Sequence, residues 1–246
     1  MKKIIIAHKQ SGETPLMCLQ RVRIEHGIDS AVSMTYAGRL DPLATGVLPI
    51  LVGEAVHDKK QWLEYGKIYT VEVLLGITTD TGDVMGMLTN SIFALPHDYL
   101  LVFKKTIKKF TGNQEQRYPI YSSKPINGKP LFVHAREGSI DTVVIPSHSV
   151  TIESIQMIDH MMIATNQLQV YIQEKIASVS GDFRQREIIE CWNTHFSGAT
   201  ADEYSVVKIQ VTCSSGTYMR QLVGDMGDMM GVPMLAYHIH REKIIQ

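Results

Sequence analysis

The stretch Tyr36–Ala55, YAGRLDPLATGVLPILVGEA, decides the fold that we expect for this chain. A glycine-containing turn leads through Asp41 into the apolar segment Val47–Val52. Because Pro42 prevents a helix from continuing through the aspartate and Gly46 frees the backbone again, the pattern predicts a constrained loop before a buried strand. An isolated Asp-Pro pair is usually only a turn, but such a loop would also hold a catalytic carboxylate rigidly.

The composition is that of an ordinary globular protein. The chain has 246 residues, of which 44% are hydrophobic and 20% are charged, so we expect one domain that spans residues 1–246. Its net charge is -1, from 24 basic and 25 acidic side chains. A protein without an overall positive charge has little long-range attraction for nucleic acid, so any RNA site has to be local.

The sequence indicates a cytoplasmic protein. The first residues, MKKIIIAHKQ, contain an apolar run too short for a signal peptide, and no later stretch reaches membrane-spanning length. The three cysteines, Cys18, Cys191 and Cys213, lie far apart and show no metal-ligand spacing. We therefore expect reduced thiols and no metal site.

The N-terminal part predicts a strand, a turn and a helix. The segment Lys3–Ala7 is short and apolar, as in a buried strand. Thr14 can cap the following helix, Pro15 suits its first position, and Gly27 ends it. Two interpretations of Lys9 in the intervening turn stay open, a solvated surface lysine or an RNA contact.

The segment Gly66–Gly76, GKIYTVEVLLG, predicts a strand because apolar residues occupy alternate positions from Tyr69 onward. Tyr69 is then either core filling or an aromatic ring available to a ligand. Asp80 and Asp83 follow in a stretch rich in turn-forming residues. Two carboxylates are too few for a cation site, so we expect a solvated turn.

The middle of the chain combines basic and aromatic residues. Apolar side chains at helical spacing predict a helix over residues 100–110, and its other face carries four lysines that are either solvated or bind phosphates. The segment Tyr118–Gly138 interleaves aromatic and basic groups, a pattern that suits contact with an RNA backbone. Val150–Ile158 and Gln167–Ile172 predict two short strands.

Residues 173–204 predict a further helix. Asp182 followed by Gln185 matches the spacing of a capping box, and Ile188, Trp192 and Phe196 form an apolar stripe. We expect this segment to pack against the domain through the stripe. Its remaining face would then be free to extend a binding surface.

The last informative segment is a strand followed by a helix. Residues 207–213 alternate as a half-buried strand, Ser214–Gly216 makes a turn, and a helix starts at Thr217. Arg220 lies about one turn into that helix, where an arginine is normally solvated.

Four segments, in the right order, resemble the motifs of the TruB family of tRNA pseudouridine synthases. They are KQSGET at 9–14, GRLDPLATGVLP at 38–49, YPIYSSKPINGKPLFVHAREG at 118–138 and CSSGTYMRQLVGDMG at 213–227. The lysine-x-tyrosine strand that contains Tyr69 is also typical of the family. Two positions depart from it, because Gln10 replaces a proline and Ser215 replaces a lysine. Residues 173–204 also depart from it and form an insert, because the family usually passes there directly into its last motif. A coincidence of all four segments is much less probable than one short match.

The resemblance implies roles for individual residues of this chain. Asp41 is implied as the catalytic residue, and Arg220 is implied as the partner that keeps it ionised and oriented. Whether Asp41 attacks the ribose or the base stays open. Tyr69 would stack on the target base, and Ile239 would line the uridine pocket.

Two further positions follow less directly from the resemblance. Tyr36 stands where the family usually has a histidine that helps to accommodate flipped-out nucleotides. We therefore expect Tyr36 to stack in the RNA without transferring a proton. Lys9 belongs to the N-terminal motif and is implied as a substrate-binding residue.

The resemblance implies the pseudouridine synthase fold, an α+β domain with a mixed, mostly antiparallel sheet, flanking helices and a central catalytic cleft. The implied activity converts uridine to pseudouridine in the T-arm loop of tRNA, usually at position 55, with no cofactor and no metal. A non-catalytic tRNA-binding or folding module is the alternative, although retention of Asp41, Tyr69 and Arg220 together favours the enzyme. We expect a cytoplasmic monomer that binds tRNA and no membrane, without the C-terminal PUA-type domain that family members commonly carry.

Overall fold

The computed structural model describes residues 2–245. Its centre is an eight-stranded sheet with the order β1-β3-β12-β4-β11-β10-β7, in which β2 pairs with β3 off this path. The strands of this sheet are β1 (Lys2–Lys9), β2 (Met34–Tyr36), β3 (Thr45–Gly53), β4 (Gly66–Leu75), β7 (Gly112–Arg117), β10 (Ser147–Ala164), β11 (Glu203–Cys213) and β12 (Met234–Ile245). Only β12 and β3 pair in parallel. The predicted α+β fold with a mixed, mostly antiparallel sheet is confirmed.

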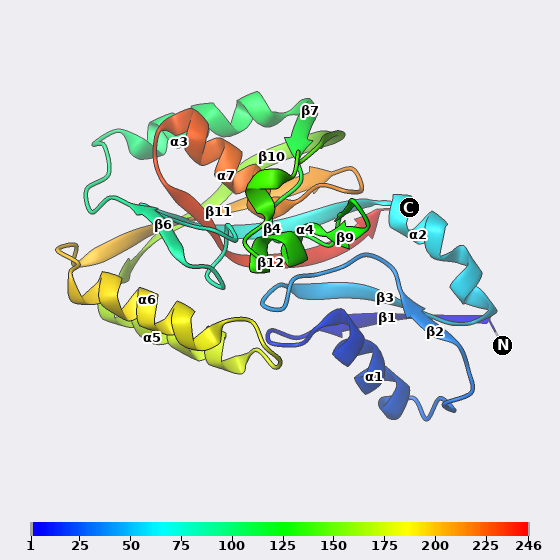
Figure 1. The fold of residues 1–246 in the computed structure, drawn as a ribbon. Helices are drawn as coiled ribbons and strands as arrows, with labels where there is room; N and C mark the ends of the chain where they lie inside the picture. The colour runs from blue at the N-terminus through cyan, green and yellow to red at the C-terminus, as the bar shows by residue number, and fades with distance from the viewer. Residues whose placement is uncertain (1, 246) are drawn as a thin grey trace.

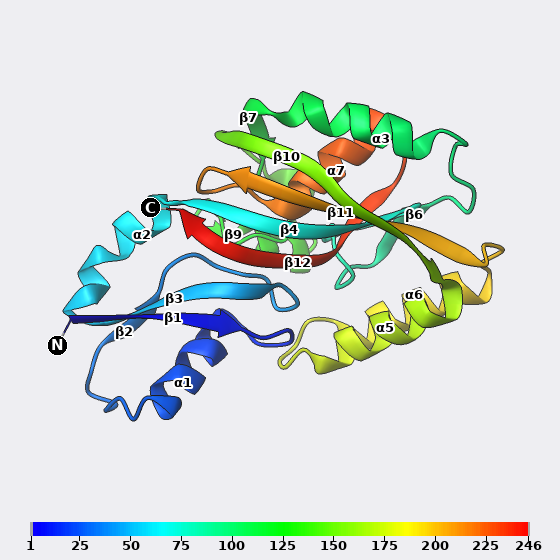
Figure 2. The ribbon, with the colours of Figure 1, turned by 180° about the vertical axis from the view of Figure 1, so that it is seen from behind.

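Helices cover both faces of this sheet (Figure 1). The α-helices of the fold are α1 (Pro15–Glu25), α2 (Lys59–Glu64), α3 (Tyr99–Ile107), α4 (Leu131–Arg136), α5 (Thr165–Ser178), α6 (Gln185–Ser197) and α7 (Met219–Met230). The reverse view in Figure 2 also shows α3 and α7 on one side of the sheet and α1, α5 and α6 on the other. Two small hairpins complete the fold, β5 (Ile77–Thr79) with β6 (Leu88–Ser91) and β8 (Pro125–Ile126) with β9 (Lys129–Pro130). No helix within residues 2–245 is long and apolar enough to cross a membrane.

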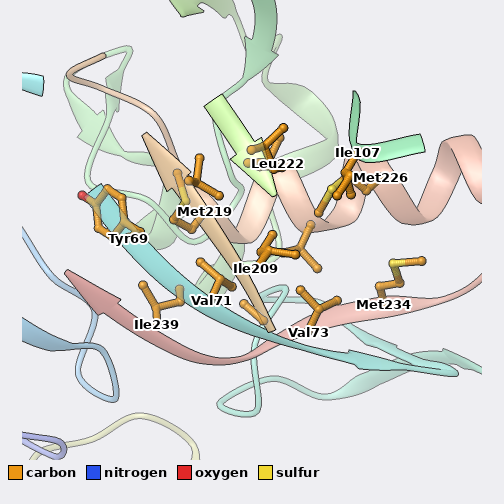
Figure 3. Close-up of a cluster of buried hydrophobic side chains, with 14 of the residues drawn as sticks. Tyr69, Val71, Val73, Ile107, Ile209, Met219, Leu222, Met226, Met234 and Ile239 are labelled. Carbon is orange, nitrogen blue, oxygen red and sulfur yellow. The ribbon is translucent and has the colours of Figure 1, made fainter. Parts of the chain in front are cut away.

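The alternation of β4 separates two hydrophobic cores. Tyr69, Val71 and Val73 face α7 and pack in one cluster with residues such as Leu222 (Figure 3). Leu74 points to the opposite face and packs in a second cluster with residues of α5 and α6. Because successive side chains of a strand point to opposite faces, one central strand anchors both layers of helices.

The N-terminal predictions are confirmed except for the burial of the first strand. Helix α1 begins at Pro15, and the Thr14 hydroxyl accepts a hydrogen bond from the Met17 amide at 3.2 Å, as in a capped helix. Ile5 and Ala7 of strand β1 pack in a cluster with α1, whereas Ile4 and Ile6 point to the opposite face and are exposed. The prediction of a buried strand was wrong because an apolar run does not reveal that only one face of the strand is covered.

The predicted strand over Gln167–Ile172 was also wrong. These residues belong to α5, in which Leu168, Ile172 and Ile176 are buried at a spacing of four, the period of one helical face. The preceding strand is longer than predicted, because β10 spans Ser147–Ala164 without interruption. The helical segment that leads into the predicted insert at 173–204 therefore begins at Thr165.

Helix α6 has the predicted buried stripe but not the predicted cap. Ile188, Trp192 and Phe196 are buried in the cluster shared with α5. The residue before the helix is Arg184, in a left-handed conformation with φ 62°, and no side chain caps the first turn. The capping-box prediction for Asp182 and Gln185 was wrong because both side chains bind elsewhere in the loop or beyond it.

Candidate active site

Asp41 lies on the predicted loop between β2 and β3. Residues 41–44 form a tight turn, in which the Ala44 amide donates to the Asp41 carbonyl at 3.0 Å. Gly46 then enters β3 with φ 109°, and a Cβ there would lie 2.2 Å from the Arg241 carbonyl oxygen. Only glycine fits at this approach, so Gly46 lets the loop run directly against β12.

Lys9 supports this loop from beneath, and the structure corrects both interpretations of it. Its side chain is fully buried, so it is neither a surface lysine nor available to RNA. The ammonium donates to the carbonyl oxygens of Gln10 at 2.9 Å, Pro42 at 2.9 Å and Ala44 at 2.6 Å. These three bonds use all three donors of a lysine and tie the backbone just after Asp41 to the turn after β1.

Arg220 holds the Asp41 carboxylate in a forked ion pair. Its Nε donates to Asp41 Oδ2 at 2.8 Å and its Nη2 to Oδ1 at 3.2 Å. The same guanidinium donates to the carbonyl oxygens of Thr81 at 2.6 Å and Tyr121 at 3.1 Å. The Arg220 side chain is 5% exposed whereas that of Asp41 is 42% exposed. The arginine is therefore locked inside the protein, and the carboxylate is presented to a ligand.

The charges around Arg220 keep it protonated. Burial disfavours the charged guanidinium, but the carboxylates of Asp41 and Asp83 outweigh burial, and the pKa of Arg220 is raised. Asp83 lies 3.7 Å from Arg220 Nε with its side chain 14% exposed, so the prediction of a solvated turn was wrong for this residue. Burial raises the pKa of the Asp83 carboxyl, and the nearby Arg220 only partly opposes this effect. Asp83 thus depends on Arg220 for its charge.

Four of the predicted residues meet at one cavity. Asp41, Tyr69, Arg220 and Ile239 all line a hollow of about 370 Å³. Tyr69 lies at the end of the α7 core, where its ring forms cavity wall and core at once (Figure 3). The burial of Tyr69 raises the pKa of its hydroxyl. A carboxylate, a cation and an apolar ring wall therefore surround a space open to solvent.

Sequence reasoning missed three cations that line the same cavity, the exposed Arg39 and the two buried ones Lys67 and Arg241. The alternation that places Tyr69 on one face of β4 places Lys67 on the same face. Arg241 follows Ile239 by two residues on β12, so the same alternation could have predicted both buried cations at the cavity. Burial and the charge of Arg241 lower the pKa of Lys67 to about 8.

Two polar atoms on this wall have no partner within residues 2–245. They are Ser122 Oγ and Arg241 Nη2, and both are buried. The rest of the Arg241 guanidinium is bound, because Nε donates to the Val47 carbonyl at 2.7 Å and Nη1 to the Arg39 carbonyl at 3.4 Å. Buried polar groups are normally paired, so these two atoms stand out as unsatisfied groups beside the cavity.

Tyr36 and Lys9 do not line this cavity. Tyr36 lines an adjoining hollow of about 460 Å³ that shares Asp41, Tyr121 and Arg220 with the first. The Lys59 ammonium lies 5.6 Å from the centre of the Tyr36 ring. Of the six predicted site residues, the structure thus places four at one cavity, one beside it and one beneath it.

Basic residues reach the site from the segment 118–138 and not from α3. Phe132 and Arg136 line the adjoining hollow, and the Lys124 ammonium lies 4.7 Å from the centre of the Tyr118 ring. The lysines of α3 and the turn after it are exposed, and none lines either hollow.

We expect Lys9 to make stability depend on pH. Burial lowers its pKa to about 8, and Glu13 and Asp41 oppose this only in part. Between that value and the ordinary lysine pKa of 10.5, the unfolded chain binds more protons than the folded chain, so this group makes the free energy of unfolding rise with pH. We expect the free energy of unfolding of wild type, relative to that of Lys9→Met, to be higher at about pH 10 than at about pH 7. Denaturant unfolding of both proteins at the two pH values measures this difference. Lys67 is present in both proteins, so its contribution cancels in the comparison. If the difference in free energy of unfolding between wild type and Lys9→Met does not change with pH, the lowered pKa of Lys9 is contradicted.

A family model described as "TruB family pseudouridylate synthase (N terminal domain)" matches residues 28–177. The matched range contains the Asp41 loop, β4 and the segment 118–138. It ends within α5, before α6 and the Arg220 motif.

Curated relatives carry the name tRNA pseudouridine synthase B. The one from Idiomarina loihiensis is 29% identical over 243 residues, which are 98% of this chain and 62% of that protein. The one from Cupriavidus metallidurans is 32% identical over 197 residues, 80% of this chain and 48% of that protein. The one from Bacillus subtilis is 29% identical over 239 residues, 97% of this chain and 63% of that protein. The chain therefore spans less than two thirds of the length of these relatives.

Solved structures share the fold at lower identity. A Cbf5-Nop10-Gar1 complex contains a chain with a TM-score of 0.58 and 17% identity, matched over 98% of this chain and 48% of that chain. An H/ACA RNP bound to a substrate RNA that contains 2'-deoxyuridine gives a TM-score of 0.54 and 16% identity, over 98% of this chain and 47% of that chain. At these identities the likeness shows the fold alone.

Proposed function

The chain belongs to the TruB family of pseudouridylate synthases, and from this premise we propose that it converts uridine to pseudouridine in the T-arm loop of tRNA. The observation that carries the proposal is the forked ion pair of Asp41 with Arg220 beside the Tyr69 ring. A binding site alone needs no anion presented toward an RNA backbone, which is itself negatively charged.

Each part of the cavity has a task in this reaction. The bond between uracil N1 and ribose C1′ breaks, the base turns, and a bond between C5 and C1′ forms; N1 gains a proton and C5 loses one, so no atom is gained or lost overall. Asp41 starts the cleavage as the reactive carboxylate. Arg220 keeps Asp41 ionised and oriented. Tyr69 and Ile239 retain the freed base between apolar surfaces while it turns.

The substrate is held by groups at the rim and wall of the two hollows. Arg39 is exposed and lines both of them, so it can neutralise a phosphate. Ser122 Oγ and Arg241 Nη2 lack partners within the described residues and suit the polar edge of uracil. Tyr36 offers its ring to a neighbouring nucleotide in the adjoining hollow. A single chain supplies every one of these groups, so we propose that the monomer is the acting unit.

The test is to map pseudouridine in unmodified tRNA incubated with the purified protein. Asp41→Asn serves as the matched control, because it has nearly the same shape without the charge. Pseudouridine at the T-arm uridine with wild type alone supports the proposal. Tight tRNA binding without any pseudouridine would instead indicate the non-catalytic binding or folding module.

Substitutions at Tyr69 separate stacking from the role of its hydroxyl. Tyr69→Ala should weaken substrate binding by about 1 to 3 kcal/mol, the range for losing one stacked base. Tyr69→Phe keeps the ring and should bind normally, and we expect it to isomerise more slowly. Dissociation constants and single-turnover rates measure the two effects. Unimpaired binding and rate in both variants would argue against a stacking role.

A further inference from the structure

The loop between α5 and α6, which we call the insert loop (Val179–Arg184), reaches the active-site cleft. Helices α5 and α6 cover the sheet face opposite α7, as Figure 1 shows. Their connecting loop nevertheless places Asp182, Phe183 and Arg184 in the lining of the hollow that also contains Asp41. The end of α5 abuts the turn after β1, where a Cβ on Gly12 would lie 2.6 Å from the Ser178 carbonyl oxygen. The insertion is thus built into the cleft.

Hydrogen bonds from Gln185 set the shape of the insert loop. Its Oε1 accepts from the Phe183 amide at 2.9 Å, and its Nε2 donates to the carbonyl oxygens of Val179 at 3.0 Å and Gly181 at 2.6 Å. Arg184 is held at φ 62°, a left-handed conformation that is unfavourable for a non-glycine residue. Such a conformation persists where the surroundings enforce it, and it is found most often at functional sites.

Arg184 bridges two other segments of the cleft. Its Nη1 donates to Asp80 Oδ2 at 2.9 Å, and its guanidinium lies 4.7 Å from the centre of the Tyr121 ring. The Tyr121 hydroxyl donates to the same Asp80 oxygen at 3.0 Å. The Arg184 and Asp80 side chains are only 28% and 24% exposed, so these contacts are partly shielded from water.

The two bridged segments are the ones that hold Arg220. Thr81, next to Asp80, and Tyr121 supply the carbonyl oxygens that accept from the Arg220 guanidinium. Asp80 is anchored on its other side as well, because its Oδ1 accepts from the Met87 amide at 2.8 Å. A displacement of either carbonyl would let Arg220 rotate and move Asp41 with it.

We propose that Arg184 is a positioning residue for the isomerisation, acting through Asp80 and Tyr121 on the Arg220–Asp41 pair. This inference rests on the proposed function. The insertion thereby contributes to the reaction centre instead of serving as a separate RNA-binding surface. Charge supports this choice, because residues 173–204 hold more acidic than basic side chains, which disfavours an RNA backbone. The basic ones are Lys175, Arg184 and Arg186, and the acidic ones are Glu174, Asp182, Glu187, Glu190, Asp202 and Glu203.

The experiment compares Arg184→Met with Arg186→Met in the full chain. Arg186 is a matched control because its side chain is 87% exposed and, within residues 2–245, pairs only with Glu190 on the same helix. With saturating tRNA, we expect Arg184→Met to lower the single-turnover rate about tenfold and to leave the tRNA dissociation constant within about twofold. Arg184→Lys keeps the pair with Asp80 and should recover part of the rate, and Arg186→Met should match wild type.

Hydrogen exchange of the free protein gives a readout that does not need activity. Arg184→Met should speed exchange in peptides covering residues 79–88 and 119–133, and Arg186→Met should not. An unchanged rate, or a weaker dissociation constant with an unchanged saturating rate, would overturn the inference. If wild type forms no pseudouridine while exchange in Arg184→Met changes as expected, the proposed function fails. In that case the inference that Arg184 positions the segments holding Arg220 still stands. Unchanged exchange overturns that positioning directly.

Discussion

Replacing Asp41 with asparagine should abolish pseudouridine formation and leave tRNA binding close to normal. Asparagine preserves the shape of the side chain and one oxygen that can accept from Arg220, so the cavity keeps its walls. The negative charge and the reactive carboxylate are lost. We expect the single-turnover rate to fall more than about 1000-fold, the scale of loss when a group at the reacting centre is removed.

The measurement is pseudouridine formed per enzyme on a substrate tRNA, together with the dissociation constant of the same tRNA. Asp141→Asn is the matched control, because Asp141 is exposed and lines neither hollow. Turnover of Asp41→Asn within a few-fold of wild type would remove Asp41 from the mechanism. A large loss of binding would instead indicate that the loop itself has moved.

Arg220→Met should unfold far more easily than wild type and lose activity. The substitution removes a cation that contacts Asp41 and lies 3.7 Å from Asp83, and it leaves the carbonyl oxygens of Thr81 and Tyr121 without this donor. Breaking a buried ion pair on one side typically costs about 3 to 5 kcal/mol, because the other charge is left uncompensated. Here Asp83, whose side chain is 14% exposed, is that charge, whereas solvent screens Asp41, which is 42% exposed.

The stability loss in Arg220→Met should depend on pH. The pKa of Asp83 is already raised by burial, and removing Arg220 raises it further. Over the range between the ordinary carboxyl pKa and this raised value, the folded chain binds more protons than the unfolded chain, so stability falls as pH rises. The deficit relative to wild type should therefore be smaller at about pH 5 than at about pH 7.

Urea unfolding at both pH values measures this effect. Arg220→Lys provides a second variant, since a lysine restores the charge without the forked geometry. We expect Arg220→Lys to regain part of the stability and little of the activity. A loss below about 1 kcal/mol in Arg220→Met, the range of a solvated surface pair, would refute the buried ion pair.

Patterns within a few residues were enough to predict many of the elements. The alternation in Gly66–Gly76 predicted β4 and the face that Tyr69 shares with the core. The cap at Thr14 predicted where α1 begins. The resemblance, carried by GRLDPLATGVLP and CSSGTYMRQLVGDMG, placed Asp41 and Arg220 in one site, and their side chains do meet. These features are determined by local backbone preference, or by short segments whose chemistry is distinctive.

Other features were decided only by the tertiary structure. Lys9 looks like a surface lysine in the sequence, and only the folded loop supplies the three carbonyl oxygens that bury it. Asp182 and Gln185 have the spacing of a capping box, yet Asp182 binds the distant Arg136 and Gln185 binds the backbone of its own loop.

The physical reason is sequence separation. Arg220 and Asp41 are 179 residues apart and Arg184 and Asp80 are 104 apart, so no local pattern shows whether a charge will meet a partner. A charged or polar side chain is stable in either setting, exposed to water or buried with its partners. The sequence by itself therefore determined most of the elements and, through the resemblance, the presence of Asp41, Tyr69 and Arg220 in the cleft. Only the tertiary packing decided which charges are buried, paired and held around Asp41, through the loop over Lys9, Arg220 of α7 and Arg184 of the insertion.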